Sequence, residues 1–465
     1  DLHLCDRRQR QMCIRDSGEG EEVNLELMDL YKKMKSKDFG KKDFLRRAAE
    51  IDGIYVPSLY KVYYNDDGTV KEIIPQDNVR PIIKKRIIKD FDKVFYPENF
   101  VVPFTDIVHD RISVEVLRGC IRGCRFCQAG FLYRPFREKS PETVCREAET
   151  LCGNTGYEEI SLASLSTSDH SEIGKILTEL IPYTEKQHIN LSLPSLRVDN
   201  FSKELMDEVK KVRKSGLTFA PEAGTQRLRN VINKNVTEEE VMRTCRTAFE
   251  GGYTSVKLYF MLGLPTETDE DIVGITKLAQ KIVDLYYSIP RRQKGKGVQV
   301  SISTATFVPK PFTPFEFEPQ ATRSEIMHKQ ETLMNSITSK KIKASWHDPS
   351  TSILEAALAR GDRRMGTAVY RAWEKGCKFD SWGEHFSYEK WREAFEESGL
   401  DMEFYACRRR DYEEIMPWDH LDYYINKEFL VRENIKAKRA ETTENCRSKC
   451  SACGVSREIG GPCFG

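Results

Sequence analysis

The chain has 465 residues, of which 39% are hydrophobic and 31% charged, with a formal net charge of +1. This is the composition of an ordinary soluble globular protein with room for two or three domains. The balanced charge excludes a whole-molecule field for a polyanion, and we interpret the basic runs 80–89 and 291–297 as solvated faces. No signal peptide or membrane-spanning run is visible, so the 14 cysteines indicate free thiols in a reducing cytoplasm.

The N-terminal part of the chain contains three different segments. Residues 1–17 are polar and lack periodicity, so we expect them to be extraneous sequence that adds nothing to the fold. Residues 18–50 begin with a glycine turn that leads into an amphipathic helix. Residues 51–108 form a linker, in which Asp67-Gly68 between two β-rich runs predicts a hairpin.

From about residue 109 to residue 335, strand and helix patterns alternate regularly. Six βα units in series imply a parallel sheet with right-handed crossovers. The region has about 225 residues, close to the usual size of a (βα)8 barrel, and six units would leave such a barrel open on one side. The sequence therefore predicts an α/β fold with a partial (βα)6 TIM-like barrel. The six expected strands are 112–117, 158–164, 189–195, 217–224, 255–265 and 298–307.

Helix signals separate the expected strands. Pro141 after Ser140 suits the first position of one helix, and Thr237 with Glu240 forms a capping box at the start of another. Beyond the barrel region the alternation is expected to stop, and two further segments follow. The other expected helices are 171–183, 203–216 and 269–287, and the two C-terminal segments are a mixed extension, 336–440, and a Cys-rich tail, 441–465.

Three cysteines stand close together directly after the first expected barrel strand. Cys120, Cys124 and Cys127 have the spacing Cys-x3-Cys-x2-Cys, which lets three thiolates hold three corners of a [4Fe–4S] cluster and leaves one iron open. A structural zinc site would need four ligands in two pairs, and no suitable second pair follows. Three buried cysteines without a metal are the other alternative. The clustering and the flanking glycines favour the open iron–sulfur cluster.

The tail repeats this spacing and adds a fourth thiol. Cys446, Cys450 and Cys453 again form Cys-x3-Cys-x2-Cys, and Cys463 follows ten residues later. Four ligands would satisfy either zinc or a second [4Fe–4S] cluster, and a flexible reactive tail is the alternative. We expect the four sulfurs to converge on one metal within a few ångströms, because a metal neutralises neighbouring thiolates and orders a tail that has no core.

With Phe126 before its third cysteine, the first motif resembles that of the radical S-adenosylmethionine (SAM) superfamily. The segments VEVLRGCIRGCRFCQAGFLYRPFRE, FAPEAGTQRLRNVINK, FMLGLPTET and FVPKPFTPF resemble more closely the uncharacterised radical SAM proteins that carry a cobalamin-binding domain. The resemblance implies an enzyme that cleaves SAM, bound at the open iron, to a 5′-deoxyadenosyl radical. It also implies that residues 18–50 are the remnant of a cobalamin domain, so this chain alone is expected to bind cobalamin poorly.

The same resemblance assigns residues that would contact SAM. Phe126 would pack beside the adenine, with core packing as the alternative. Glu222 would accept from a ribose hydroxyl or from the amino group, with a strand-end ion pair as the alternative. The segment from Ser164 to Asp169 stands where related enzymes hold the amino group of SAM with Gly-Gly-Glu. Its hydroxyls and the Asp169 carboxylate would replace Gly-Gly-Glu.

Further candidates are a turn and several arginines. Gly263 and Pro265 form a tight turn after the fifth strand, which would let the backbone approach the adenine end of SAM. Arginines beside the cysteine loop and elsewhere would bind a carboxylate or an anionic substrate, or form structural ion pairs. These arginines are Arg134, Arg137, Arg197 and those of the RGDRR motif at 360–364.

Three functions remain open from the sequence. The first is a radical SAM enzyme, with cobalamin-dependent methyl transfer in the full-length protein. The second is a methylthiotransferase-like RNA-modifying enzyme, against which no C-terminal RNA-binding β-barrel is visible. The third is a non-catalytic iron–sulfur or RNA-associated protein. The expected partners are an unidentified substrate, a reductant such as flavodoxin or ferredoxin, and a small protein of unknown function, fused or adjacent, with no membrane.

Overall fold

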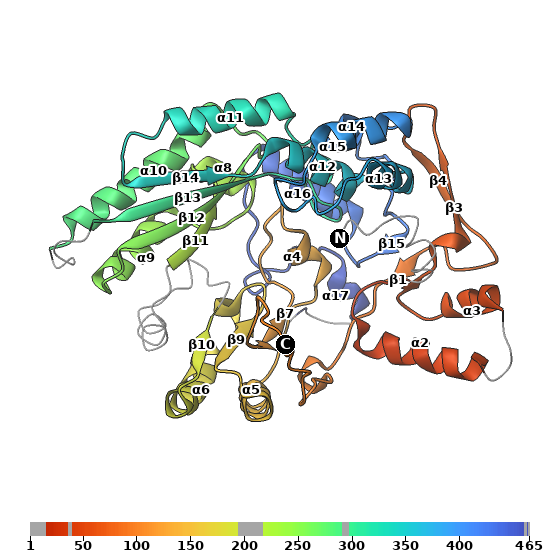
Figure 1. Cartoon of the computed structure of the whole chain (residues 1–465), viewed down its shortest axis with the longest axis horizontal. Coiled ribbons are helices and arrows are strands. Elements are labelled where there is room, and N and C mark those ends of the chain that lie inside the picture. The colour runs from red at the N-terminus through yellow and green to blue at the C-terminus, as the bar shows by residue number, and fades with distance from the viewer. Residues whose placement is uncertain (1–14, 36–39, 194–216, 291–296, 460–462, 464–465) are drawn as a thin grey trace. The chain divides into compact units, whose positions relative to one another are not determined.

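A computed structural model describes residues 15–35, 40–193, 217–290, 297–459 and 463 (Figure 1). Within these ranges the chain forms two compact units, each assembled from separated stretches of sequence. No helix in the described part of the chain is long and apolar enough to cross a membrane. Unit 1 lies within Asp1–Lys89, Thr306–Met327 and His347–Asn434, and unit 2 within Asp90–Ala305, His328–Trp346 and Ile435–Gly465.

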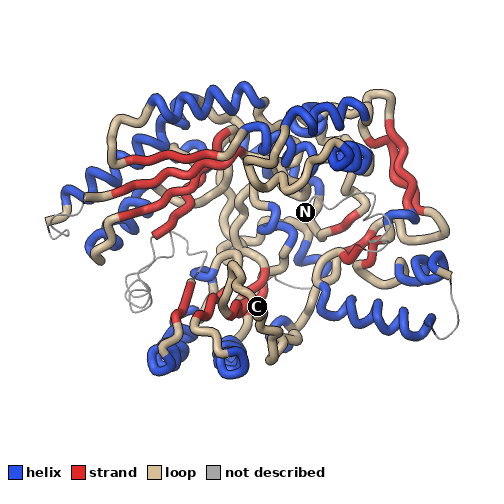
Figure 2. Tube along the Cα trace, viewed as in Figure 1, coloured by secondary structure: helices blue, strands red, loops and turns tan. Residues whose placement is uncertain are grey.

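Unit 2 is built on two sheets. The first has the strand order β10-β9-β6, with both pairings parallel. The second has the order β11-β12-β13-β14, in which β11 pairs with β12, and β13 with β14, in parallel; these four strands lie side by side (Figures 1 and 2). The strands are β6 Ile112–Glu115, β9 Glu159–Ala163, β10 Asn190–Ser192, β11 Leu217–Glu222, β12 Ser255–Leu262, β13 Gln299–Thr306 and β14 Ile342–Trp346.

All six expected barrel strands are present, but a barrel is not confirmed. Among the described residues no pairing joins the two sheets, so the architecture is a mixed α/β fold with two parallel sheets. The expected helix 203–216 and the end of the third expected strand lie outside the described residues. The parallel strand direction still places the carboxyl ends of the strands within one sheet at a common edge.

One parallel strand was not expected. β14 pairs with β13 from Val300–Ile342 to Thr304–Trp346, after the helix α11 Arg323–Asn335. The alternation therefore continues beyond residue 335, contrary to the expectation that it stops there. Only the first of the five residues of β14 is buried, so the strand lacks the apolar pattern that revealed the others.

The helices of unit 2 begin where the capping signals predict. The Ser140 hydroxyl accepts from the Thr143 N–H at 3.3 Å at the start of α5. At α9 both bonds of the capping box form, because Thr237 and Glu240 exchange side-chain contacts with each other's N–H. The helices are α4 Gln128–Leu132, α5 Pro141–Thr155, α6 Ile173–Gln187, α8 Gln226–Val231, α9 Glu238–Glu250, α10 Asp269–Ser288 and α17 Val455–Glu458, with 3-10 turns at Phe91–Lys93 and Thr167–Asp169.

Each sheet of unit 2 has its own apolar core. The sheet β10-β9-β6 packs with α5 and α6 around buried residues such as Ile160, Leu162 and Leu180. The sheet β11–β14 packs with α9 and α10, and Phe249 meets Tyr286 edge-on at 5.2 Å between ring centroids. The alternation of strands and helices in the sequence thus corresponds to strands that are buried against helices. Functional side chains are therefore expected in the loops at the strand ends.

Unit 1 contains the N-terminal elements. The expected hairpin is confirmed, because β3 and β4 pair in antiparallel around the Asp67-Gly68 turn. The expected helix after Gly18 is also confirmed as α2. The elements are β1 Arg15–Asp16, α2 Gly20–Lys35, α3 Lys41–Ala48, β2 Ile54–Tyr55, a 3-10 turn Pro57–Leu59, β3 Tyr60–Tyr64, β4 Val70–Pro75 and β5 Ile83–Lys84. Two further strands, β7 Leu117–Arg118 and β8 Arg137–Glu138, belong to unit 2 and pair with each other at the base of the cysteine loop.

The expectation that residues 1–17 add nothing to the fold is wrong for residues 15–17. Arg15 and Asp16 form β1, which pairs in antiparallel with β2. The Ser17 N–H donates to the Gly53 carbonyl at 2.5 Å, and the Ser17 carbonyl accepts from the Arg86 N–H at 2.7 Å. Backbone pairing needs no apolar period, which is why the sequence pattern missed it. Residues 1–14 lie outside the described residues.

The C-terminal half of unit 1 is mostly helical. Four helices enclose an apolar core that includes Ile353, Trp391 and Phe395. These helices were described from the sequence only as a mixed extension. They are α12 Pro349–Arg360, α13 Met365–Glu374, α14 Tyr388–Glu397 and α15 Met402–Ala406, followed by β15 Leu421–Asp422 and α16 Lys427–Lys438.

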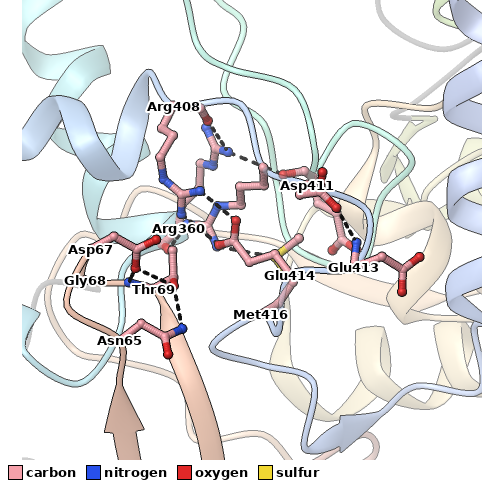
Figure 3. A network of polar contacts seen from close by, with 12 residues as sticks. Asn65, Asp67, Gly68, Thr69, Arg360, Arg408, Asp411, Glu413, Glu414 and Met416 are labelled. Carbon is pink, nitrogen blue, oxygen red and sulfur yellow. Dashed lines mark hydrogen bonds and ion pairs between the residues drawn. The ribbon is translucent and has the colours of Figure 1, made fainter.

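The RGDRR arginines are part of the packing of unit 1. Arg360 is 1% exposed and donates to the Arg408 carbonyl at 3.1 Å, while Arg408 holds Glu414 through two bonds of 2.6 and 2.7 Å (Figure 3). Arg363 donates to the Tyr60 carbonyl at 2.6 Å, and Arg364 bonds Asp362 and the hairpin carbonyl of Gly68. The structural alternative therefore holds for these arginines.

A buried histidine makes the stability of unit 1 depend on pH. His420 is 8% exposed and stacks against Tyr55 at 4.8 Å between ring centroids. Burial and the nearby charge of Arg363 lower the pKa of His420 to about 4.

We predict that unit 1 loses about 3 kcal/mol of unfolding free energy between pH 7 and pH 4 through this one residue. The folded state binds the proton less tightly than the unfolded state, so stability falls as the pH drops from 6.5 through 4. Denaturant titrations of the wild type and of His420→Phe at both pH values test this, because the variant lacks the group. An equal pH dependence in both proteins would contradict the prediction.

Candidate functional site

The three cysteines of the first motif lie in one loop at the carboxyl end of β6. The short antiparallel pair β7–β8 closes this loop at its base, with Leu117 opposite Glu138 and Arg118 opposite Arg137. Cys127 is the residue before α4, and its N–H donates to the Cys124 carbonyl at 3.1 Å. The Arg122 N–H reaches the Cys120 sulfur at 3.4 Å. Local backbone turns therefore bring all three thiols onto one short loop.

Gly119 is the entry to this loop and cannot carry a side chain. Its φ is +87°, and a Cβ would lie 2.7 Å from the carbonyl oxygens of Tyr133 and Pro135. Only glycine adopts this conformation without strain and allows such a close approach of backbone. The chain that enters the loop and the chain that leaves it are thus packed directly against each other.

Arg125 and Asn233 hold the far side of the loop. Arg125 is fully buried, and its N–H and guanidinium donate to the carbonyls of Ile232 at 3.0 Å and Val231 at 2.9 Å. The Asn233 side-chain amide donates to the Gly123 carbonyl at 2.9 Å. These bonds attach the loop to the segment after α8, so the cysteines and the end of β11 are positioned together.

The thiols of this loop lie within one another's electrostatic field. Burial, followed by the charge of Cys124, raises the pKa of Cys120 to about 12, and the same two causes raise the pKa of Cys127. Buried thiols of this kind ionise only when a cation compensates the charge, which is what the iron of a cluster provides. The donor set of three sulfurs in a partly buried loop therefore fits a [4Fe–4S] cluster with one open iron.

The described structure does not bring the sulfurs to coordination distance. Among the described residues, no three Cys, His, Asp or Glu side chains converge closely enough to hold a metal ion, at either cysteine motif. The expectation that the four tail sulfurs lie within a few ångströms of one another is therefore not met. Neutral thiols gain nothing from such close approach, whereas thiolates gather around a cation.

Glu222 and Phe126 meet at Lys234. The Lys234 ammonium lies 3.2 Å from the Glu222 carboxylate and 5.9 Å from the centre of the Phe126 ring. Its charge also acts on the thiol of Cys127. Glu222 ends β11 at a register irregularity with φ +68°, a conformation that turns its side chain out of the strand alternation. The ion-pair alternative for Glu222 is thus observed, and the pair lies beside the cysteine loop.

The segment after β9 is fastened to the cysteine loop by Asp169. Its carboxylate accepts from the Arg122 Nε at 2.9 Å and from the Ser166 hydroxyl at 2.6 Å, and its side chain is 1% exposed. The Ser164 hydroxyl is 2.8 Å from that of Thr167 and accepts from the Ser166 N–H at 3.2 Å. Asp169 therefore orients Arg122 between two cysteines, and Ser164 shapes its own turn.

The turn after β12 is tied to the end of β11. The Gly263 N–H donates to the Glu267 carboxylate at 2.7 Å, and Pro265 is half-buried. Arg227, on α8, donates to the Thr266 hydroxyl at 3.1 Å and carbonyl at 2.8 Å. The turn with Gly263 and Pro265 is therefore rigid and adjoins the segment that carries Glu222.

The arginines beside the cysteine loop support its backbone. Arg134 is 3% exposed and donates to the carbonyls of Gly130 at 3.1 Å and Arg122 at 3.3 Å. Arg137 donates to the Pro135 carbonyl at 3.3 Å. Both contacts fit the structural alternative rather than an anion site, and Arg197 lies outside the described residues.

Several residues of this site were not identified from the sequence. Four residues connect the cysteine loop to other strand ends: Lys234, Arg122, Arg125 and Asn233. The partner of each lies in a different segment of the sequence, so these contacts could not be predicted without the fold. A signal existed in part, since Arg122 and Arg125 lie between the cysteines and Lys234 closes the segment FAPEAGTQRLRNVINK. A residue inside a metal-binding loop is a reasonable candidate for a role in orienting that loop.

Two sequence models of protein families match the chain. Residues 114–279 match the model described as Radical SAM superfamily, which covers the cysteine loop and the ends of β9, β11 and β12. Over these residues the chain is similar to radical SAM enzymes. Residues 14–57 match the model for the N-terminal region of radical SAM proteins, which agrees with the placement of β1 in the fold.

The curated relatives of this chain are distant. The uncharacterised protein MJ0966 of Methanocaldococcus jannaschii is 29% identical over 65% of the chain and 63% of its own length. The putative methylthiotransferase MJ0865 of the same organism is 24% identical over 38% of the chain and 41% of its own length. The uncharacterised methyltransferase PH0819 of Pyrococcus horikoshii is 24% identical over 53% of the chain and 50% of its own length. The chain spans less than two thirds of each relative.

Solved structures with a similar chain include a named radical SAM methyltransferase. The radical SAM methyltransferase TsrM from Kitasatospora setae, with cobalamin and a [4Fe–4S] cluster bound, aligns with a TM-score of 0.43 at 14% identity. The alignment covers 65% of this chain and 54% of that chain.

Proposed function

We propose that this protein binds a [4Fe–4S] cluster through Cys120, Cys124 and Cys127 and cleaves SAM reductively at the open iron. The observation that carries the proposal is the single loop with three thiols. Asp169, after β9, accepts from Arg122 of this loop, and Lys234 pairs with Glu222 at the end of β11 beside it. A cluster bound there would supply one electron to SAM, giving methionine and a 5′-deoxyadenosyl radical.

The residues of this chain would hold the loop and bind SAM. Arg125 and Asn233 fix the loop backbone through hydrogen bonds, so the backbone that carries the three cysteines stays in place when SAM binds. Lys234 holds Glu222 beside the loop, where the carboxylate can accept from a ribose hydroxyl or the amino group of SAM. Phe126, under the same ammonium, offers a ring for the adenine, and the rigid turn at Gly263 and Pro265 offers its backbone.

The test of this function is SAM turnover by the anaerobically reconstituted, reduced protein. We expect 5′-deoxyadenosine and methionine in equal amounts, which a non-catalytic iron–sulfur or RNA-associated protein would not form. Reductants of the flavodoxin or ferredoxin class supply the electron. Absence of 5′-deoxyadenosine from a protein with a full complement of iron and bound SAM would overturn the proposal.

For the group transferred, we propose methyl transfer, with cobalamin in the full-length protein. The support is the resemblance of the core segments to cobalamin-associated radical SAM proteins and a relative described as a methyltransferase. Methylthio transfer is the second candidate, because other relatives are described as methylthiotransferases, two of them acting on tRNA or the ribosomal protein uS12. Mass analysis of modified products separates the two, since methylthio transfer adds sulfur.

We predict that Glu222→Gln weakens SAM binding about tenfold and leaves the iron content unchanged. A charged acceptor contributes about 1.4 kcal/mol or more through one hydrogen bond, and an amide replaces it poorly. Equilibrium binding of SAM to the reconstituted variant measures the effect. Glu250→Gln, an exposed position at the end of α9, is the matched control and should bind as the wild type does. Unchanged SAM affinity in Glu222→Gln would show that Glu222 forms a structural ion pair and does not bind SAM.

A further inference from the structure

The tail of the chain is docked on the cysteine loop. The Cys446 N–H donates to the carbonyl of Ile121, the residue after Cys120, at 2.9 Å. The Glu441 carbonyl accepts from the Arg125 guanidinium at 2.8 Å, and the Thr443 N–H donates to the Asn233 side chain at 2.8 Å. These are the two residues that hold the loop from its far side, so the tail joins the same network of buried bonds.

Arg447 extends this attachment to the end of β9. Its guanidinium donates to the Asp169 carbonyl and to the Glu138 carboxylate, both at 2.8 Å, and lies 5.2 Å from the centre of the Phe136 ring. Asp169 in turn orients Arg122 of the cysteine loop. The first residues of the tail motif are thus fixed by backbone and side-chain bonds to the site of the first cluster.

The four thiols of the tail differ in their exposure. Cys453 is 6% exposed and Cys446 and Cys463 are half-buried, while Cys450 is exposed. The buried guanidinium of Arg134, which donates to the backbone of the cysteine loop, also lies near Cys446 and Cys453.

We propose that Cys446, Cys450, Cys453 and Cys463 bind a second iron–sulfur cluster, docked against the loop of the first. The spacing of the first three is the same Cys-x3-Cys-x2-Cys as in the loop at Cys120, and the fourth thiol completes the coordination. Four protein ligands leave no open iron, so this centre does not bind SAM. Thiolate sets of this kind also bind zinc, but the repeated spacing favours a cubane cluster.

The tail also needs a metal for a structural reason. Beyond Arg447 the buried residues of its described part are Cys453, Gly454 and Val455, and its one helix there is the short α17. A segment with so little apolar burial gains its order from ligands rather than from a core. Iron binding would draw the four sulfurs together and fix the part of the tail that the hydrogen bonds near Cys446 do not reach.

The experiment is reconstitution of the full chain with ferrous iron and sulfide, followed by iron and zinc analysis and Mössbauer spectroscopy. We expect ~8 iron atoms per wild-type chain and ~4 in a Cys120→Ala, Cys124→Ala, Cys127→Ala triple variant, whose remaining iron lies in the tail. A Cys450→Ser, Cys453→Ser variant should also retain ~4. Cys407→Ser, a half-buried cysteine of unit 1, is the control and should match the wild type.

The outcomes separate this inference from the proposed function. SAM should perturb the electron paramagnetic resonance signal of the tail double variant and not that of the triple variant. Cys450→Ser alone removes an exposed thiol, so its lower iron content reports ligation rather than damaged packing. A triple variant without iron, a tail filled with zinc, or unchanged iron in the double variant would overturn the inference, whether or not the first cluster cleaves SAM.

Discussion

Replacing Cys124 with alanine is expected to abolish SAM cleavage while the chain stays folded. Cys124 is the middle ligand of the proposed cluster site, and its charge acts on both Cys120 and Cys127. Two remaining thiols cannot hold three corners of a cluster. Changes outside the ligand set typically cost 10- to 100-fold in metal sites, so loss of a ligand should lower 5′-deoxyadenosine formation by more than about 100-fold. The loss of one small buried group should cost about 1–2 kcal/mol of stability.

A matched control is available for this substitution. Cys145, on α5, is 8% exposed, the same as Cys124, and belongs to neither motif. Cys145→Ala should therefore lose similar packing and keep the wild-type rate. Product analysis by chromatography, with the iron content of each protein, gives the comparison. Continued formation of 5′-deoxyadenosine by Cys124→Ala would show that another set of ligands binds the SAM-cleaving cluster.

The local signals in the sequence predicted local structure well. The capping box at Thr237 and the turn at Asp67-Gly68 involve residues within a few positions of each other, and both are observed. β1 and β14 were not predicted, because each is specified by its partner strand more than by its own residues. Arg15–Asp16 pairs with a strand nearly 40 positions away, and β14 is largely exposed.

The same distinction separates the predicted from the unpredicted parts of the site. The cysteine loop is a continuous motif, so its candidate ligands could be proposed from their spacing. Glu222 and Ser164 were placed by resemblance, but the ion pair of Glu222 with Lys234 and the bond of Asp169 to Arg122 needed the fold. The second of these joins residues 47 positions apart. Spacing predicts what a loop can bind, whereas the orientation of that loop depends on contacts between distant segments.

The attachment of the tail could not be predicted from either cysteine motif. Its contacts are mostly to backbone carbonyls, at Ile121 and Asp169 among others, and any sequence supplies a carbonyl. The side chains that fasten it, Arg125 and Asn233, also serve the first loop. A change in either residue should therefore affect both cysteine sets, a coupling that the spacing of the motifs alone does not suggest.

Lys139→Met is expected to be the most destabilising substitution beside the cysteine loop. Lys139 is 1% exposed, and its ammonium donates to both oxygens of Glu147, at 2.8 and 2.7 Å. It also lies 4.6 Å from the centre of the Tyr96 ring. Removing one partner of a buried ion pair leaves the other charge without compensation, which costs about 3–5 kcal/mol. Chemical unfolding of the purified variant measures this loss.

The pH dependence of the loss identifies its cause. Burial raises the pKa of Glu147 above 4.5, and Lys139 opposes this shift. Without Lys139 the folded state binds a proton to Glu147 more tightly than the unfolded state does. The loss should therefore be largest at pH values above the folded pKa and should shrink as the pH falls toward 4.5. Lys175→Met breaks an exposed pair with Glu142 and should stay near the wild-type stability. A loss in Lys139→Met that is constant with pH would indicate damaged packing instead of an uncompensated carboxylate.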